Sequence, residues 1–407
     1  MRVQQQDLLQ PTEQKVKMIA SAEMLFIFLA IISVAMNLRA PLTSVGPLVA
    51  EIRTSLGISS LAAGFLTTLP LLAFAVLSPF APKLARRFGM ETTLFFASII
   101  LTAGIFLRMI AGTGTLFTGT LFIGLGIAFG NVLIPGLIKS SFPNHIGVVT
   151  GIYAVSMNLC AAIASGLSVP VSAKLGWNGS LGYWGFISLA AILVLLPRVK
   201  LRRGEAASAT AGQPTANLMK SRLAWNVTVF MGLQSLMFYT IVAWLPEILK
   251  EQGVTASAAG WILSLMQFAL IPFTFIIPVI AGKMKSQIPL VWATAALFIL
   301  GTLGILTGIG GTALMPVWAV LIGIGGGSAF SLAMMFFNLR TRSPQEASEL
   351  SGMAQSFGYL LAATGPALFG IFHDATGSWT LPLWMLLVVS FIILITGLVS
   401  GQNRQVQ

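Results

Sequence analysis

The residue best suited to chemistry in this sequence is an arginine inside a long apolar run. Arg39 lies in the apolar segment at residues 24–50. It is about 15 residues from the start of that segment, or roughly 22 Å along a helix. A guanidinium at the middle of a bilayer costs at least about 2.5 to 3.5 kcal/mol unless it faces a wet cavity or a partner. Arg39 is therefore a candidate for a functional site.

The acidic residues are not placed to neutralise Arg39. All 11 fall in tails, connections or the ends of apolar runs: Asp7, Glu13, Glu23, Glu51, Glu91, Glu205, Glu247, Glu251, Glu346, Glu349 and Asp374. We therefore expect an anionic or strongly dipolar ligand to meet the guanidinium, which presents a planar set of donors. Backbone carbonyls or side-chain amides are the alternative partners.

Other polar side chains occur at similar depth in several apolar runs, as a binding cavity inside a membrane protein requires. With Arg39, they make up our candidate substrate-binding set: Asn37, Thr43, Asn131, Tyr153, Asn158, Gln234, Tyr239, Gln267, Gln355 and Tyr359. The alternative for each of them is a hydrogen bond between helices, worth about 0.6 kcal/mol.

The sequence offers no candidate catalytic or metal site, and we expect neither a cofactor nor enzymatic activity. Cys160 is the only cysteine, so one chain cannot form a thiolate cluster. His145 and His373 fall at helix ends or in connections, which leaves Glu51 as the acid to test for proton coupling. An enzyme would need a nucleophile or an acid–base pair at bilayer depth.

The composition shows what solvent surrounds these residues. Of the 407 residues, 56% are hydrophobic and 8% are charged, against roughly 25% charged in an ordinary soluble protein. Apolar runs long enough to cross a bilayer, which takes about 20 residues, recur along the whole chain. The net charge of +12 is scattered over short connections, so we expect no nucleic-acid partner.

We expect six membrane helices in each half of the chain. The first six are near 22–49, 59–82, 91–110, 115–138, 147–171 and 180–197. The second six are near 222–246, 257–281, 289–308, 313–337, 348–372 and 379–399. With both termini in the cytoplasm most Lys and Arg lie inside, as the positive-inside rule requires. The cations then expected outside are Arg53, Arg108, Lys174 and Lys250.

The same pattern predicts five segments in a multi-pass protein of the cell membrane. They are a cytoplasmic N-terminal tail at 1–21, an N-terminal six-helix half at 22–197, a cytoplasmic linker at 198–221, a C-terminal six-helix half at 222–399 and a cytoplasmic C-terminal tail at 400–407. The linker is the one long polar connection, and its small residues are typical of a flexible segment.

The two halves repeat each other. The matched pairs, at offsets of 196, 199 and 201 residues, include Glu51 with Glu247, Pro82 with Pro278, Gly124 with Gly323, and Gly151 with Gly352. At the last offset Asn158 corresponds to Tyr359, so equivalent helices would present different polar groups to one cavity. Parallel repeats of this kind are found in transporters whose substrate site lies between the halves.

The first apolar run also carries a motif. Residues 37–48 read Asn-Leu-Arg-Ala-Pro-Leu-Thr-Ser-Val-Gly-Pro-Leu. This run resembles the signature of the cyanate-permease and 2-nitroimidazole-transporter branch of the major facilitator superfamily. Residues 81–89 are similar to the second connection of that branch. The resemblance implies an all-α membrane protein with the major facilitator fold, built from twelve transmembrane helices in two six-helix halves.

The resemblance implies a secondary active or facilitative transporter that works by alternating access. Its cargo would be a small anion or a compact polar compound, cyanate-like or nitroimidazole-like. Efflux of a broader set of toxic or drug-like amphiphiles is the alternative, and counterflow of substrate would distinguish either from a channel. The expected partners are a small-molecule substrate and membrane lipid, with the protein a monomer. Co-transport of a proton is left open.

The sequence departs from the wider superfamily at two places. Pro82 and Arg86 stand where the second connection usually has a Gly and an Asp, so a conformational lock through that Asp is not expected. The segment 151–170 lacks the antiporter pattern of drug/proton exchangers, which disfavours multidrug efflux. Lys139 and Arg340, near repeat equivalents at cytoplasmic helix ends, should be snorkelling cations, with a gate as the alternative.

Overall fold

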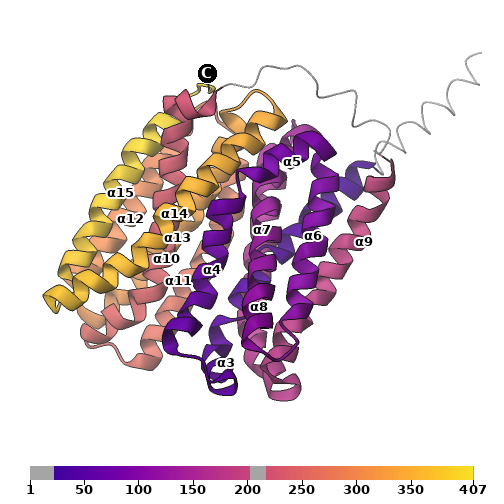
Figure 1. Cartoon of the computed structure of the whole chain (residues 1–407). Coiled ribbons are helices and arrows are strands. Elements are labelled where there is room, and N and C mark those ends of the chain that lie inside the picture. The colour runs from indigo at the N-terminus through magenta and orange to yellow at the C-terminus, as the bar shows by residue number, and fades with distance from the viewer. Residues whose placement is uncertain (1–22, 202–216, 407) are drawn as a thin grey trace, which may run out of the picture.

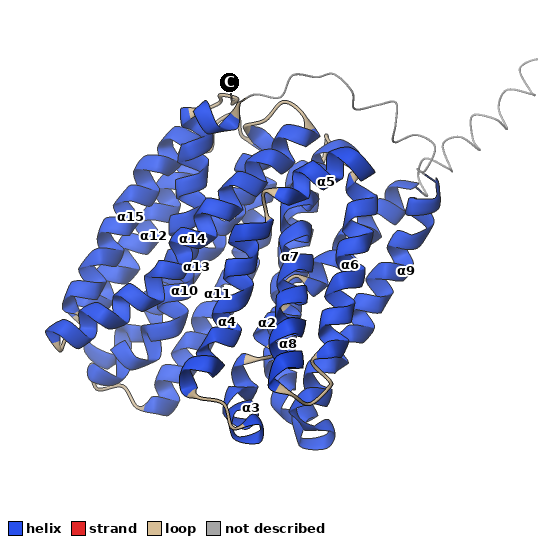
Figure 2. Ribbon diagram, in the orientation of Figure 1, coloured by secondary structure: helices blue, strands red, loops and turns tan. Residues whose placement is uncertain are grey.

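The computed structural model describes residues 23–201 and 217–406. Within these ranges the protein is helical and contains no β-strand (Figure 2). The expected N-terminal tail at 1–21 and most of the expected linker at 198–221 lie outside the described residues. The all-α architecture predicted from the sequence is therefore confirmed.

The first six spans occupy one side of the molecule (Figure 1, indigo to magenta). The first span is helical over the described residues 23–37. The elements that follow are α2 (Ala40–Thr43), η1 (Gly46–Leu48), α3 (Val49–Leu56), α4 (Ser60–Leu77), α5 (Phe80–Phe88), α6 (Met90–Leu107), α7 (Thr113–Ser141), α8 (Ile146–Tyr183) and α9 (Gly185–Leu201).

The second six spans form the other side (Figure 1, magenta-orange to yellow). They are preceded by the short helix η3 (Leu218–Lys220). The spans are α10 (Arg222–Glu251), α11 (Ala256–Lys283), α12 (Ile288–Thr307), α13 (Gly311–Leu339), α14 (Pro344–Thr376) and α15 (Thr380–Ser400). We refer below to the end of the bundle that carries α5 as the α5 end and to the opposite end as the α3 end.

The length and hydropathy of the helices suit a bilayer. In the described part of the chain, 9 helices are long and apolar enough to cross a membrane, or 10 if the bent pair α4 and α5 counts as one span. One of the nine, Ile146–Pro197, contains both α8 and most of α9, and α14 is a further helix of 33 residues. Large apolar side chains are exposed on the outer surface, including Phe186, Leu193, Trp261 and Ile395 at 61–73% exposure. Such a surface is suited to contact with a membrane.

The two halves begin equivalent helices in the same way. Ser59 caps α4 by accepting a hydrogen bond from the Ala62 N–H at 3.2 Å, and Thr255 caps α11 by accepting one from the Ala258 N–H at 3.3 Å. A side-chain oxygen at this position satisfies a backbone donor that has no partner inside the helix. Ser59 and Thr255 are separated by the repeat offset of 196, so the repeat extends to the caps.

The first span is not the continuous helix expected at 22–49. It breaks into a turn at Leu38 and Arg39, and α2 and η1 follow with a second turn between them. Pro41 and Pro47 lie at the starts of these two short helices. Proline lacks an N–H and therefore removes a helical hydrogen bond, which explains why an unbroken apolar run does not form an unbroken helix.

The second span also differs from the helix expected at 59–82. Residues Thr68–Leu77 and Phe80–Phe88 meet at a bend of 55°. Pro79 cannot donate to the Ala75 carbonyl one turn earlier. The hydroxyl of Ser356, on α14 of the other half, donates to this carbonyl instead. The bend is thus stabilised by a contact between the halves.

The fifth and sixth spans are joined more closely than the sequence indicates. We expected helices at 147–171 and 180–197, but α8 runs to Tyr183 and changes direction at Gly176. Gly176 has φ +72° and ψ +168°, a conformation that a side chain would strain. The expected gap of several residues is therefore a kink at one glycine.

The halves contact each other at the α5 end. Helices α4 and α7 pack against α14, and α8 packs against α11. Arg86 of α5 forms an ion pair with Glu349 of α14. Lys139, at the end of α7, donates to the Asn338 carbonyl at 2.7 Å and to the Thr341 hydroxyl at 2.9 Å, where α13 ends. A cation is favoured at that position because the last carbonyls of a helix carry partial negative charge.

Lys139 and Arg340 differ although they are near repeat equivalents. Arg340 is 1% exposed, and its Nε donates to the Ser400 carbonyl at 2.7 Å within the same half. Lys139 instead contacts the opposite half. The expectation of two snorkelling cations is therefore wrong for Arg340, which is held by carbonyls at the end of α15.

Close backbone contacts set the distance between neighbouring helices. A Cβ atom built on Gly104 of α6 would lie 2.7 Å from the Gly119 carbonyl oxygen of α7, and one built on Gly119 would lie 2.6 Å from the Gly104 carbonyl oxygen. Small residues allow this approach because apolar burial gives little drive for helix association inside a membrane.

We predict that Gly104→Ala lowers the melting temperature of the purified protein in detergent. The methyl group must push two backbones apart, and overpacking of this kind costs about 1 to 3 kcal/mol. Gly260→Ala is the matched control, because nothing lies within 4 Å of a Cβ at that helical glycine. An equal effect of the two substitutions would show that the α6–α7 contact is not tight.

Candidate functional site

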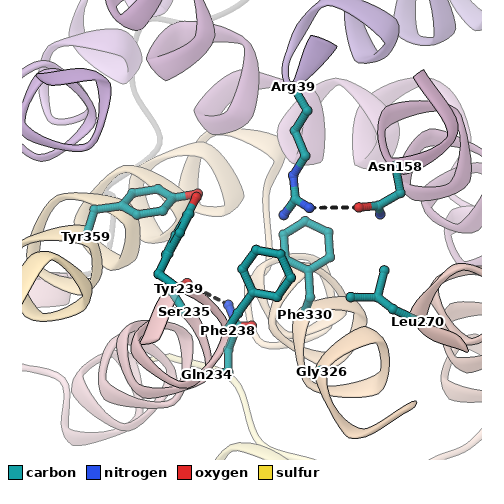
Figure 3. A pocket seen from close by; sticks show the side chains of 10 residues that line it. All are labelled: Arg39, Asn158, Gln234, Ser235, Phe238, Tyr239, Leu270, Gly326, Phe330 and Tyr359. Carbon is teal, nitrogen blue, oxygen red and sulfur yellow. Dashed lines mark hydrogen bonds between the residues drawn. The ribbon is translucent and has the colours of Figure 1, made fainter. Parts of the chain in front are cut away.

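A cavity of about 350 Å³ lies between the two halves (Figure 3). It is lined by Arg39, Asn158, Gln234, Ser235, Phe238, Tyr239, Leu270, Gly326, Phe330 and Tyr359. A second cavity of about 310 Å³ shares Arg39, Tyr239, Phe330 and Tyr359 with it and adds Asn131 and several apolar side chains. The two cavities therefore meet at Arg39.

Arg39 projects from the break in the first span. It is the residue immediately before α2, with φ −129° and ψ −35°. Its Nη1 donates to the Asn158 Oδ1 at 2.7 Å, as the dashed line in Figure 3 shows. The Asn158 Nδ2 donates to the Ala154 carbonyl at 2.8 Å, which directs the amide oxygen towards Arg39. An amide partner, one of the expected alternatives, is thus present.

Two aromatic rings of the other half also contact the guanidinium. The Arg39 Cζ lies 5.4 Å from the Phe238 ring centroid and 5.2 Å from that of Phe330. A cation over an aromatic face gains about 0.5 to 2 kcal/mol, depending on how dry the site is. The cation is therefore held by one half through a hydrogen bond and by the other through ring faces.

No carboxylate balances this cation at the site. Among the described residues, neither cavity is lined by an Asp or a Glu. The hydrogen bond to Asn158 uses one of the five N–H donors of the guanidinium. A half-buried cation with neutral partners is electrostatically suited to bind an anion or the negative end of a dipole.

Two tyrosine hydroxyls complete the polar part of the cavity. Figure 3 shows the hydroxyl groups of Tyr239 and Tyr359 pointing towards each other at one side of the cavity. The Tyr359 ring packs against Phe74 of the first half, with the ring centroids 5.1 Å apart. The cavity thus combines an arginine, an amide and hydroxyl groups with an aromatic wall.

The structure brings six of the eleven predicted site residues to the two cavities. They are Arg39, Asn131, Asn158, Gln234, Tyr239 and Tyr359. Gln234 is turned towards its own helix, where its Nε2 donates to the Ser235 hydroxyl at 2.8 Å. Asn158 is also engaged, since it accepts from Arg39 and donates to the Ala154 carbonyl.

Five predicted site residues line neither cavity. Asn37 donates to the Ser33 carbonyl, and Thr43 donates to the Ala161 carbonyl of α8 at 3.0 Å. Tyr153 donates to the Asn131 Oδ1 at 3.3 Å and so contacts a lining residue from behind. Gln355 is fully buried and donates to the Ser351 hydroxyl, while Gln267 is exposed.

The sequence-based set missed Ser235, Phe238, Leu270 and Phe330. The internal repeat could have found them. Offsets of 196 relate Arg39 to Ser235, Leu42 to Phe238 and Phe74 to Leu270, and an offset of 199 relates Asn131 to Phe330. All these residues line one cavity or both, so equivalent positions of the two halves face the same space.

The fold and this central cavity define a class of membrane transporter. The family model of the Major Facilitator Superfamily matches residues 24–366. The chain therefore belongs to the major facilitator superfamily.

Three relatives narrow this membership. The chain is 46% identical over 378 residues to an uncharacterised transporter of Bacillus subtilis, YycB, covering 92% of this chain and 93% of the relative. It is 39% identical over 382 residues to the 2-nitroimidazole transporter of Escherichia coli, with 93% and 95% covered. The cyanate transport protein CynX of Escherichia coli is 26% identical over 359 residues, with 86% and 91% covered. The resemblance drawn from residues 37–48 is confirmed.

The fold is also found among solved structures. The proton:xylose symporter XylE superposes with a TM-score of 0.75 at 13% sequence identity, covering 92% of this chain and 95% of that chain. At this identity the match shows the fold alone. It confirms the expected architecture of twelve helices in two halves.

We predict that Asn158→Ala destabilises the protein by about 1 to 3 kcal/mol, because the Arg39 guanidinium loses its hydrogen-bond acceptor in a half-buried site. The measurement is thermal unfolding without ligand. Asn226→Ala is the matched control, since the Asn226 Nδ2 donates to the carbonyl four residues earlier at 2.8 Å, as that of Asn158 does. Equal destabilisation by both variants would mean that the bond to Arg39 contributes nothing.

Proposed function

We propose that this protein carries a small anion or compact polar compound, cyanate-like or nitroimidazole-like, across the cell membrane by alternating access. The observation that supports this proposal most strongly is Arg39. It is a half-buried cation between the two halves, and no described carboxylate lines its cavities. An anion or nitro group could accept hydrogen bonds from the guanidinium that Asn158 leaves available.

The walls of the site support a compact, planar cargo. The rings of Phe238 and Phe330 flank Arg39 and could stack on a planar heterocycle. Two relatives carry names that refer to 2-nitroimidazole and to cyanate, and both compounds are compact and polar.

We also propose an orientation and a conformational state. The α5 end carries Lys83, Arg86, Arg87, Lys139 and Arg342, so the positive-inside rule places this end, and both termini, in the cytoplasm. The ion pair of Arg86 with Glu349 and the Lys139 contact join the halves there. We therefore assign the cytoplasmic side as closed and Arg39 as the point around which access alternates.

The remaining assignments follow the same model. We propose a monomer in lipid, with six-helix halves at 22–197 and 222–399, a cytoplasmic linker at 198–221 and cytoplasmic tails at 1–21 and 400–407. With no described carboxylate lining the cavities, a co-transported proton would travel with a weakly acidic substrate. Facilitated diffusion is the alternative for a neutral one.

The first test is thermal stabilisation of the purified wild type and an Arg39→Gln variant by cyanate, 2-nitroimidazole and a bulky cationic dye. Ligand at about 100 times its dissociation constant should add roughly 2.7 kcal/mol to the free energy of unfolding. We expect cyanate or 2-nitroimidazole to stabilise the wild type and Arg39→Gln to weaken the binding and reduce the stabilisation strongly.

Counterflow in proteoliposomes with the stabilising compound then tests exchange, which a channel cannot perform. Stabilisation by the dye alone would favour efflux of drug-like amphiphiles. A response to the small compounds that Arg39→Gln leaves undiminished would contradict the role of Arg39.

Alternating access predicts that Lys139→Met opens the cytoplasmic side. The substitution removes the charge that bonds to the end of α13 in the other half. The measurement is N-ethylmaleimide labelling of a Ser348→Cys reporter in a Cys160→Ala background, because Ser348 is buried where α14 meets Gly136 of α7. We expect labelling several-fold faster than without Lys139→Met.

Lys283→Met is the control, as Lys283 is an exposed cation at the end of α11. If Lys139→Met leaves the labelling rate unchanged, or if both variants raise it equally, the Lys139 contact does not hold the cytoplasmic side closed.

A further inference from the structure

The break in the first span leaves a backbone carbonyl without its usual partner. In a continuous helix the Pro41 carbonyl would accept from the Val45 N–H. Here the Val45 N–H donates to the Leu42 carbonyl at 3.3 Å, because the chain tightens before η1. Inside an apolar region an unpaired carbonyl costs several kcal/mol. The Ser44 hydroxyl donates to the Pro41 carbonyl at 3.3 Å, which is long for an O–H···O bond, so the carbonyl can accept a second, stronger donor from elsewhere.

Arg108 supplies that donor. Its Nη1 donates to the Pro41 carbonyl at 2.7 Å. Its Nε and Nη2 donate to the Thr120 hydroxyl of α7 at 3.1 and 2.9 Å. The sequence predicts Arg108 among the cations on the outside; in the structure it caps the end of α6 and is 1% exposed. A buried guanidinium is expensive, and the bonds to Pro41 and Thr120 offset that cost.

The fork of Arg108 therefore connects α6, α7 and the broken span. The Thr120 hydroxyl donates in turn to the Leu116 carbonyl, so its lone pairs face Arg108. Gly119 lies directly behind, where a Cβ would be 3.0 Å from the Arg108 Cγ. A lysine could reach one acceptor as a point charge, but it lacks the planar fork that reaches two.

The hydrogen bond from Arg108 reaches the first span at Pro41, two residues after Arg39. Arg39 is the N-cap of α2, the four-residue helix that contains Pro41. On its other side α2 is tied to α8, since Thr43 donates to the Ala161 carbonyl. So short a helix has little rigidity of its own, and the hydrogen bonds at Pro41 and Thr43 hold it against α6 and α8.

We propose that Arg108 is a positioning residue for Arg39, and that it tunes substrate affinity by holding α2 in the orientation that presents the Arg39 guanidinium to the cavity. This inference rests on the proposed contact between Arg39 and substrate. Arg108 itself lines neither cavity, so its effect on binding passes through Arg39. Displacement by about 1 Å is enough to weaken a positioned contact strongly.

The test is a double-mutant cycle on the dissociation constant of 2-nitroimidazole, with cyanate as the second probe, using the purified full-length protein. We expect Arg108→Gln and Arg108→Lys each to weaken binding about tenfold when Arg39 is present. In the Arg39→Gln background the same changes should have no further effect, because residues that act through one another are not additive. Thr120→Val keeps the shape of the buried side chain and should also weaken binding, but by less. This variant tests the proposal even if Arg108→Gln does not fold.

Arg340→Gln is the control for general destabilisation. It removes another buried arginine that bonds to a carbonyl, but far from the first span, and it should leave the dissociation constant unchanged. The inference would be overturned if Arg39→Gln binds weakly while Arg108→Lys and Thr120→Val both bind as tightly as the wild type. Weakening by Arg108→Lys that persists undiminished in the Arg39→Gln background would also overturn it. Binding that Arg39→Gln leaves as tight as in the wild type would instead overturn the proposed function.

A second experiment needs no ligand, and it tests the inference even if the wild type binds neither 2-nitroimidazole nor cyanate. Phenylglyoxal modifies arginines, and peptide mass spectrometry can report the rate at Arg39 alone. We expect Arg108→Lys and Thr120→Val to raise that rate several-fold by loosening α2, and Arg340→Gln to leave it unchanged. An unchanged rate in the Arg108→Lys and Thr120→Val variants would overturn the positioning role.

Discussion

Polar groups that leave water inside a membrane must find partners within the protein, and in this structure each break in a helix creates such a need. The carbonyl freed at Pro41 is taken by Arg108, and the carbonyl that Pro79 cannot pair is taken by Ser356. The carbonyls at the end of α13 are taken by Lys139. The irregular parts of the backbone therefore determine which helices are joined and where the two halves meet.

The two halves use one backbone plan for different chemistry. Where the first half places Arg39 and Asn158, the equivalent positions of the second half hold Ser235 and Tyr359. A symmetrical pair of arginines would repel and could not share one small cavity. One cation facing hydroxyl groups and rings gives the cavity a polarity, so a ligand with a negative end has a preferred direction of entry.

The order and number of helices could be predicted from the sequence because each span must match the thickness of the bilayer. Site residues were harder to predict, since residue number sets the depth of a side chain while its face depends on helical phase. Asn37 lies two residues before Arg39, which in a helix means nearly the opposite face, and it donates into the first half. Thr43 follows the break at Leu38 and Arg39, and it donates to α8 of the first half. The contacts of Arg108 could not be predicted for a different reason. A cation at the end of an apolar run is usually exposed, and only the fold brings this one beside Pro41.

The bond between Ser356 and Ala75 joins opposite halves, and it also bears on how those halves could separate. Pro79 has no N–H, so no amide of its own helix can replace the lost donor. A dry gap opening at the α5 end would leave the Ala75 carbonyl bare, at a cost of several kcal/mol. Separation there must therefore coincide with entry of water, and the hydration of a single carbonyl becomes part of the barrier between conformations.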